Sequence, residues 1–157
     1  MPKIYIATDH AGFSLKEELK TFLLGMGYEI EDCGAYEDVS SDDYPDLVRP
    51  CAEKVAKDSG SFGIVIGASG QGEAMVANKV PGVRAMGYYG GNSATQTDAS
   101  GNQYDVLGSA RSHNDANVLS LGARFLTFDE AKSAVTTFLQ TPCSTEERHV
   151  RRRVKIG

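Results

Sequence analysis

Apolar residues in this chain fall into short runs, separated by segments in which they recur at helical spacing. Five runs have the length and residue types of strands, and one of them is continuously apolar, as in a buried parallel strand. The predicted strands are residues 3–8, 28–32, 62–66, 83–88 and 118–121. Because strands and helices alternate, the pattern predicts an α/β fold in which helices cover both faces of a parallel sheet through right-handed connections.

Capping residues and prolines predict where the helices begin. The predicted helices start near Ser14, Tyr44, Glu73, Ser109, Thr127 and Ser144. Three of them open with a capping-box pair, which is Ser14 with Glu17, Thr127 with Glu130, or Ser144 with Glu147. Pro45 fits a first helical turn, whereas Pro50 is expected to kink or delay the second helix.

Residues 89–108 interrupt this alternation. They are rich in Gly, Asn, Ser, Thr and Gln and show no apolar periodicity, so we predict a long loop or insertion. The chain has 157 residues, which is the size of one domain with its own core. We therefore expect residues 1–157 to form a single domain that carries this insertion and a basic tail at 144–157.

Composition excludes several classes of protein. A formal net charge of −5 argues against a nucleic-acid-binding domain. Three cysteines without CxxC spacing predict reduced thiols, with neither a disulfide framework nor a zinc site. No apolar stretch approaches the ~18 residues of a membrane span, and the first apolar run is too short for a signal peptide. We expect a cytoplasmic protein that does not act at a membrane.

The run Gly-Ala-Ser-Gly-Gln-Gly-Glu at residues 67–73 directly follows a predicted strand. Parallel sheets bind ligands beyond the carboxyl ends of their strands, and glycines let successive N–H groups face one anion. The spacing fits neither a Walker A motif nor a dinucleotide fingerprint. Glu73 ends the loop, and a carboxylate beside N–H donors suits proton abstraction next to a carbonyl. The alternatives are a tight turn without a ligand and a solvated glutamate.

Two pairs of polar residues flank predicted strands. Asp9 and His10 follow the first strand, and they offer a carboxylate and an imidazole to a phosphate or a sugar hydroxyl. His113 and Asn114 precede the fifth strand, and we expect them near the same edge of the sheet. The alternative for Asp9 and His10 is an Asx-type turn with a surface histidine.

Arginines near the C-terminus offer a local anion site. Arg124 follows the fifth strand, and Arg148 and Arg152 are four residues apart, so they share one face of a predicted tail helix. The guanidinium fork suits a phosphate better than an ammonium group does. The alternative is a solvated basic tail.

Several motifs occur in a fixed order along the chain. They are Asp9-His10-Ala11-Gly12, Asp43-Tyr44-Pro45, the loop at 67–73, Ala77-Asn78-Lys79, Gly82-Val83-Arg84-Ala85, His113-Asn114-Asp115-Ala116-Asn117 and Arg148-His149. Each is weak singly, but the order and spacing are specific. The chain resembles the B-type ribose-5-phosphate isomerases and the related galactose-6-phosphate isomerases, over almost its whole length apart from 89–108.

The resemblance implies a three-layer α/β/α Rossmann-like fold with a five-stranded parallel sheet. It implies a cofactor-free and metal-free aldose–ketose isomerase that interconverts ribose 5-phosphate and ribulose 5-phosphate through a cis-enediolate. It also implies a homodimer or a dimer of dimers whose subunits share active sites. Two alternatives stay open: the same chemistry on a tetrose or hexose phosphate, because of the insertion, and a non-catalytic sugar-phosphate-binding module.

The resemblance also implies roles for particular residues. In many members of the family a cysteine is the base at the position of Gly67, so here the role passes to Glu73. Ser69 would help to hold the enediolate, and His113 would assist ring opening. The implied substrate-binding residues are Asp9, His10, Tyr44, Ala68, Gly70, Gln71, Gly72, Asn114, Arg124, Arg148 and Arg152, with Arg148 and Arg152 supplied by the partner subunit.

Overall fold

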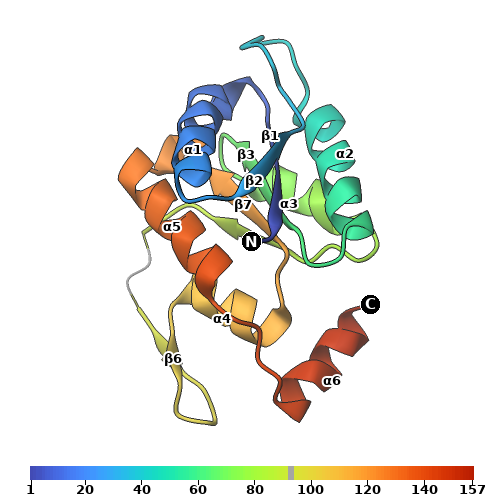
Figure 1. The fold of residues 1–157 in the computed structure, drawn as a ribbon, viewed down its shortest axis with the longest axis vertical. Helices are drawn as coiled ribbons and strands as arrows, with labels where there is room; N and C mark the ends of the chain where they lie inside the picture. The colour runs from blue at the N-terminus through green and yellow to red at the C-terminus, as the bar shows by residue number, and fades with distance from the viewer. Residues whose placement is uncertain (92–93) are drawn as a thin grey trace.

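The computed structural model describes residues 1–91 and 94–157, and these form a layered α/β fold (Figure 1). The central sheet has five parallel strands in the order β2-β1-β3-β7-β4. Their bounds are Lys3–Thr8 for β1, Glu29–Asp32 for β2, Phe62–Gly67 for β3, Ala85–Tyr88 for β4 and Val118–Gly122 for β7. The prediction of five strands in a parallel sheet is therefore confirmed.

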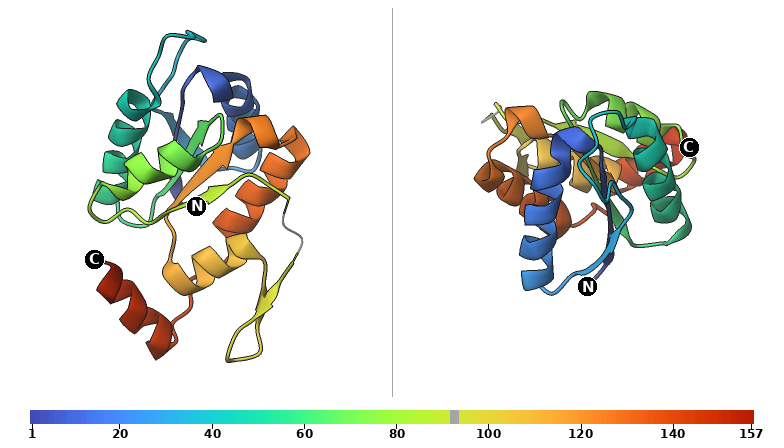
Figure 2. Two further views of the ribbon diagram at one scale, coloured as in Figure 1. Left: turned by 180° about the vertical axis from the view of Figure 1, so that it is seen from behind. Right: turned by 90° about the horizontal axis from the view of Figure 1, so that it is seen from above.

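Helices cover both faces of this sheet (Figures 1 and 2). On one face lie α1 (Phe13–Gly25) and α5 (Phe128–Gln140), and on the other lie α2 (Tyr44–Lys57) and α3 (Gln71–Asn78). Two apolar cores result, one holding Leu19 of α1 and Phe138 of α5, the other holding Val48 of α2 and Ala77 of α3. The α/β/α layering implied by the resemblance is confirmed.

One of the three predicted capping boxes is confirmed. Thr127 and Glu130 exchange the expected hydrogen bonds at the start of α5. The box at Ser14 is wrong, because a 3-10 turn, η1 (His10–Gly12), leads directly into α1 and Asp9 caps that turn instead. The box at Ser144 is also wrong, since α6 (Glu147–Ile156) begins after Glu146.

Pro50 does not delay the second helix. It lies inside α2, which starts at Tyr44 with Pro45 in its first turn. The apolar face of α2, with Val48, Cys51 and Val55 all buried, favours a continuous helix. Tertiary packing therefore outweighs the hydrogen bond that Pro50 cannot donate.

The segment 89–108 contains more regular structure than predicted. Residues 92–93 lie outside the described part, but β5 (Gln96–Thr97) and β6 (Gln103–Tyr104) form an antiparallel hairpin. Helix α4 (Val106–Asn114) begins three residues before the predicted start, with Asp105 as its side-chain cap. Of the two predicted possibilities, a long loop or an insertion, an unstructured loop is wrong, because side-chain-to-backbone bonds at Asp98 and Asp105 order the segment without apolar periodicity.

The hairpin, α4 and α6 gather at one end of the molecule, opposite the turn where α1 begins (Figures 1 and 2). Helix α6 packs on α4, but Val150, Val154 and Ile156 of α6 remain exposed. Among the described residues, no helix is long and apolar enough to cross a membrane.

Candidate active site

The candidate site lies at the carboxyl edge of the sheet, where β1, β3 and β7 end side by side. Strand β1 leads into buried Asp9, β3 leads into the glycine loop, and β7 leads into η2 (Ala123–Phe125), which contains Arg124. The Arg124 backbone N–H donates to the Ala68 carbonyl at 3.1 Å. The predicted convergence of Asp9, the loop and Arg124 at one edge is thus observed.

Close packing against β7 fixes the shape of the glycine loop. The Ser120 hydroxyl donates to the Gly70 carbonyl at 2.5 Å. Gly70 has φ of +76°, and a Cβ there would lie 2.9 Å from the Leu121 carbonyl carbon. Only glycine meets both conditions without strain. The Ser69 hydroxyl accepts from the Gln71 N–H at 3.3 Å, so the loop turns directly into α3.

Glu73 lies in the first turn of α3 and is only 4% exposed. Its carboxylate occupies the space beside the Gly67 Cα, because a Cβ built on Gly67 would overlap it. Burial raises the pKa of Glu73 and the charge of Asp9 adds to the rise, while the N–H groups of Glu73 and Gly70 act in the opposite direction. The side chain is therefore a buried carboxylate with increased basicity, set against the loop.

Tyr44 is the first residue of α2, and its ring packs against the loop. A Cβ on Gly72 would lie 2.5 Å from the Tyr44 hydroxyl, so the glycine leaves the space that this ring fills. Tyr44, which the resemblance implies as a substrate-binding residue, therefore contacts the end of the glycine loop.

His10 is held by a carboxylate that the sequence reasoning missed. Its Nδ1 lies 2.7 Å from Oδ1 of Asp42, which also accepts the His10 backbone N–H at 3.2 Å. The hydrogen bond to Asp42 raises the pKa of His10, and the charges of Asp9 and Asp38 contribute further. The sequence feature that could have indicated Asp42 is the acidic segment between β2 and α2, which we predicted only as a connecting loop.

His113 and Asn114 do not lie at this edge. They end α4 and precede β7, so they lie at the amino ends of the strands, close to α6 (Figure 1). The expectation that they share an edge with the glycine loop is wrong for a single chain. In a parallel sheet, residues that precede a strand and residues that follow it lie at opposite edges.

The two predicted tail arginines also lie at the far end of the molecule. Arg148 and Arg152 both belong to α6, where Arg148 is half-buried and Arg152 is exposed. Arg148 pairs with Glu146 and donates to the Ser100 hydroxyl at 3.1 Å. One chain therefore presents two sets of predicted residues, one at each end of the sheet.

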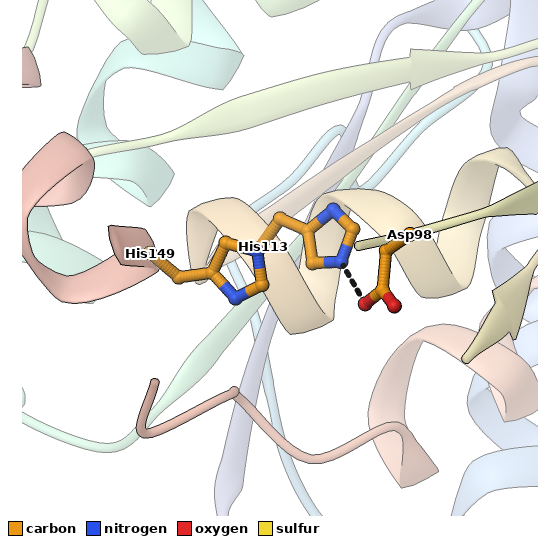
Figure 3. Close-up of side chains that lie close together, drawn as sticks. All are labelled: Asp98, His113 and His149. Atoms are coloured by element: carbon orange, nitrogen blue, oxygen red, sulfur yellow. Dashed lines mark hydrogen bonds and ion pairs between the residues drawn. The ribbon is translucent and has the colours of Figure 1, made fainter. Parts of the chain in front are cut away.

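A histidine cluster joins the hairpin to α6 at that far end (Figure 3). The rings of His113 and His149 stack with centroids 4.1 Å apart, and Nε2 of His113 lies 3.2 Å from Oδ2 of Asp98. Burial lowers the pKa of His149, and the nearby charges of His113 and Arg148 lower it further. Asp98 is the second residue that the sequence reasoning missed, because it lies inside the polar insertion.

Two groups in the described part of the chain bring three possible metal-ligating side chains together. They are Asp98 with His113 and His149, and Asp9 with His10 and Asp42. In both groups a histidine nitrogen is already hydrogen-bonded to a carboxylate, which an ion would have to displace.

Comparison with known proteins gives one consistent result. The family model described as Ribose/Galactose Isomerase matches residues 4–156. Ribose-5-phosphate isomerase B of Mycobacterium tuberculosis is 39% identical over 150 residues, which are 96% of this chain and 85% of the relative.

Solved structures agree with this match. A ribose 5-phosphate isomerase of Thermotoga maritima aligns with a TM-score of 0.85 and 39% identity, over 99% of this chain and 97% of the other. The enzyme of Mycoplasma genitalium, solved with bound ribulose 5-phosphate, aligns with a TM-score of 0.83 and 35% identity over 98% and 93% of the two chains. The chain therefore belongs to the ribose/galactose isomerase family, and both the resemblance drawn from its ordered motifs and the prediction of an aldose–ketose isomerase are confirmed.

Proposed function

We propose that this enzyme interconverts ribose 5-phosphate and ribulose 5-phosphate without a cofactor, with Glu73 as the base. The observation that carries the proposal is the buried Glu73 carboxylate, seated beside Gly67 in a loop rich in backbone N–H donors. The Mycoplasma genitalium relative binds ribulose 5-phosphate, which supports a five-carbon substrate. We also propose that the enzyme is cytoplasmic.

The reaction needs one proton to move between two neighbouring carbons. Glu73 takes the proton from C2 of the open-chain aldose, and the electron pair moves toward O1 to give a cis-enediolate. The proton on O2 passes to the neighbouring O1, and protonated Glu73 returns the carbon-bound proton to C1, which leaves a hydroxyl at C1 and the carbonyl at C2. Because burial already raises the pKa of Glu73, its protonated form is more accessible than that of a solvated glutamate.

The loop supplies the electrostatic part of catalysis. We assign the backbone N–H groups of residues 68–72 and the Ser69 hydroxyl to the enediolate oxygen, at the N-terminus of α3. Packing of Gly70 on β7 holds these donors in place before the substrate binds, so little reorganisation is needed. Asp9 and His10, from the end of β1, bind the substrate at the rim of the same loop.

Four of the assigned residues reach Glu73 only if a second copy of the chain supplies them. His113, Asn114, Arg148 and Arg152 lie at the opposite edge from Glu73 and cannot reach it within one chain. The exposed Val150, Val154 and Ile156 of α6 give the same end an apolar surface suited to a partner. We infer a homodimer, or a dimer of dimers, in which His113 assists ring opening and the two arginines bind the phosphate in the partner's site.

Mixed dimers test this sharing of active sites. We expect Glu73→Gln and His113→Ala each to be nearly inactive alone, whereas co-refolding equal amounts restores about a quarter of the wild-type sites, since half of the dimers are mixed and each holds one intact site. Turnover at saturating substrate, compared with separately refolded variants, measures the recovery. No recovery despite proven subunit exchange would show that each site is built from one chain.

The hairpin keeps open the alternative of a tetrose or hexose phosphate substrate, because it lies next to the proposed ring-opening histidine. We expect kcat/KM to be highest for the five-carbon sugar phosphates when four-, five- and six-carbon substrates are compared in one assay. A higher value for a six-carbon substrate would assign the enzyme to the galactose-6-phosphate side of the family.

Proton exchange separates catalysis from simple binding. The enzyme should incorporate deuterium from solvent at C2 of ribose 5-phosphate as it isomerises, which mass spectrometry of recovered substrate detects. Tight binding without exchange or isomerisation would instead indicate a non-catalytic sugar-phosphate-binding module.

A further inference from the structure

The β5–β6 hairpin brings its turn against the proposed ring-opening histidine. The His113 ring contacts the Tyr104 ring edge-on, with centroids 5.4 Å apart. It also stacks on the His149 ring at a centroid distance of 4.1 Å, and its Nε2 lies 3.2 Å from the Asp98 carboxylate (Figure 3). Asp98 and Tyr104 come from the hairpin segment, and His149 comes from α6. The imidazole is therefore held by two segments other than its own helix.

Asp98 is itself fixed before it reaches the histidine. Its Oδ1 accepts the N–H groups of Ser100 at 3.0 Å and Asn102 at 2.9 Å, which closes the hairpin turn. Its Oδ2 is left to face His113 at 3.2 Å and Arg148 at 3.9 Å. Burial raises the pKa of Asp98, but these hydrogen bonds outweigh it, so the pKa lies below its ordinary value and the group is ionised at neutral pH.

An ionised carboxylate only accepts hydrogen bonds, and this determines which nitrogen of His113 carries the proton. Nε2 must donate to Asp98, which leaves Nδ1 as the nitrogen that exchanges a proton with a ligand. The same carboxylate places a negative charge beside Arg148, a proposed phosphate ligand. It therefore acts on a proton-transfer group and on an anion-binding group at once.

A hydrogen-bonded pair explains the cluster better than a metal ion does. The ligand atoms of Asp98, His113 and His149 lie within 4.8 Å of one another. However, the two rings are stacked at an interplanar angle of only 25°, so their nitrogen lone pairs do not converge on one point. The Arg148 guanidinium beside Asp98 also opposes a second cation.

We propose that Asp98 is a positioning residue of the isomerase, which orients His113 for proton transfer and weakens the affinity of the neighbouring Arg148 for phosphate. This inference rests on the proposed function. On this proposal, the insertion raises kcat by orienting His113, and it weakens binding of the substrate phosphate through the charge of Asp98.

Asp98→Asn tests the proposal, because the amide oxygen still accepts the two turn N–H groups while the charge is lost. We expect kcat to fall about 10- to 100-fold, a part of the full effect of a general acid or base. The inhibition constant of inorganic phosphate should fall about three- to tenfold, because a negative charge near the phosphate is removed. The matched control is Asp105→Asn, which makes the same change in the same segment, keeps the α4 cap and leaves both quantities unchanged.

If the proposal is right, Asp98→Asn lowers kcat only when His113 is present. In a His113→Ala background, Asp98→Asn should not lower kcat further, and an additional loss of the same size there would overturn the proposal. If His113→Ala is inactive and Asp98→Asn keeps full kcat, the inference fails while the proposed function stands. If His113→Ala itself keeps full turnover, the proposed role of His113 is what fails.

A spectroscopic measurement checks the orientation without any substrate. In ¹⁵N-edited spectra recorded at a pH where the ring is neutral, His113 of the wild type should show the tautomer protonated at Nε2. Asp98→Asn should change this pattern and Asp105→Asn should not, whereas an Nδ1-protonated ring in the wild type would refute the proposal. Should Asp98→Asn fail to fold, Asp98→Ser, whose hydroxyl can accept a turn N–H, replaces it in the same comparisons.

Discussion

Replacing Glu73 with glutamine should lower kcat about 10²–10⁴-fold, which is the usual contribution of one positioned proton-transfer group. The substitution keeps the size of a side chain that fills the space beside Gly67, so the loop should keep its shape and KM should change little. Steady-state isomerisation with ribose 5-phosphate measures both constants. The matched control is Glu53→Gln on the exposed face of α2, which should behave as wild type.

The pH dependence gives a second test of the same assignment. Because burial raises the pKa of Glu73, kcat/KM of the wild type should decline at a pH above the ordinary glutamate value as the pH falls. The same pKa shift affects folding stability in the opposite direction, so that stability is favoured at low pH. A carboxyl group whose pKa is raised by folding binds protons more tightly in the folded state, so its contribution to stability is complete at low pH and is lost as pH rises through the raised pKa.

Glu73→Gln should therefore unfold at the same temperature as wild type or higher at neutral pH, since the variant has no buried charge at this position. Full turnover in a folded Glu73→Gln variant would show that another group is the base. A variant that loses turnover only because it unfolds would be recognised by a lowered melting temperature.

Replacing Lys16 with methionine should have the largest effect on folding, about 1–3 kcal/mol, because the Ala35 carbonyl loses its lysine donor and Asp32 keeps only one of its two cations, Lys20. The Lys16 side chain is fully buried, and its Nζ donates to both Asp32 oxygens at 2.7 and 2.9 Å and to the Ala35 carbonyl at 2.5 Å. Methionine fills a similar volume but donates to none of them. Urea denaturation of the two proteins measures the difference.

Lys20→Met is the matched control for this prediction. Lys20 also pairs with Asp32, at 2.6 Å, but its side chain is partly exposed, so its loss should cost about 0–1 kcal/mol. If Lys16→Met and Lys20→Met lower the free energy of unfolding equally, the Lys16–Asp32 ion pair does not hold the end of β2 against α1.

The pKa of Asp32 determines how the stability difference between wild type and Lys16→Met depends on pH. Burial raises the pKa of Asp32, but Lys16, Lys20 and the Gly34 N–H together lower it below its ordinary value. Its contribution to stability is therefore present above the unfolded pKa and is lost as the pH falls through the folded pKa. The stability difference between wild type and Lys16→Met should shrink over that acidic range.

The sequence predicts the sheet well because its signals are local. The apolar runs that became β1, β3 and β7 are buried on both faces, and such strands are recognisable without knowing their neighbours. The Thr127–Glu130 capping box is equally local, and it too is confirmed. The boxes at Ser14 and Ser144 fit the same pattern but fail, because α1 follows directly from η1 and α6 begins only after Glu146, so neither serine occupies the N-cap position.

The candidate site is predictable only in part. Asp9, the glycine loop and Arg124 meet as expected, because each directly follows a strand of the sheet. The predicted position of His113 is wrong, because His113 precedes β7 and therefore lies at the amino end of that strand, opposite the glycine loop. Asp42 and Asp98 are missed because each acts on a histidine far away in sequence, through a contact that only the folded chain creates.

The contact between Glu73 and Gly67 limits how such an enzyme can change in evolution. A Cβ at residue 67 would overlap the Glu73 carboxylate, so any side chain there requires this carboxylate to move. A thiol at residue 67 and the carboxylate of Glu73 would therefore compete for the same space, and a cysteine introduced at 67 would displace the base that we propose.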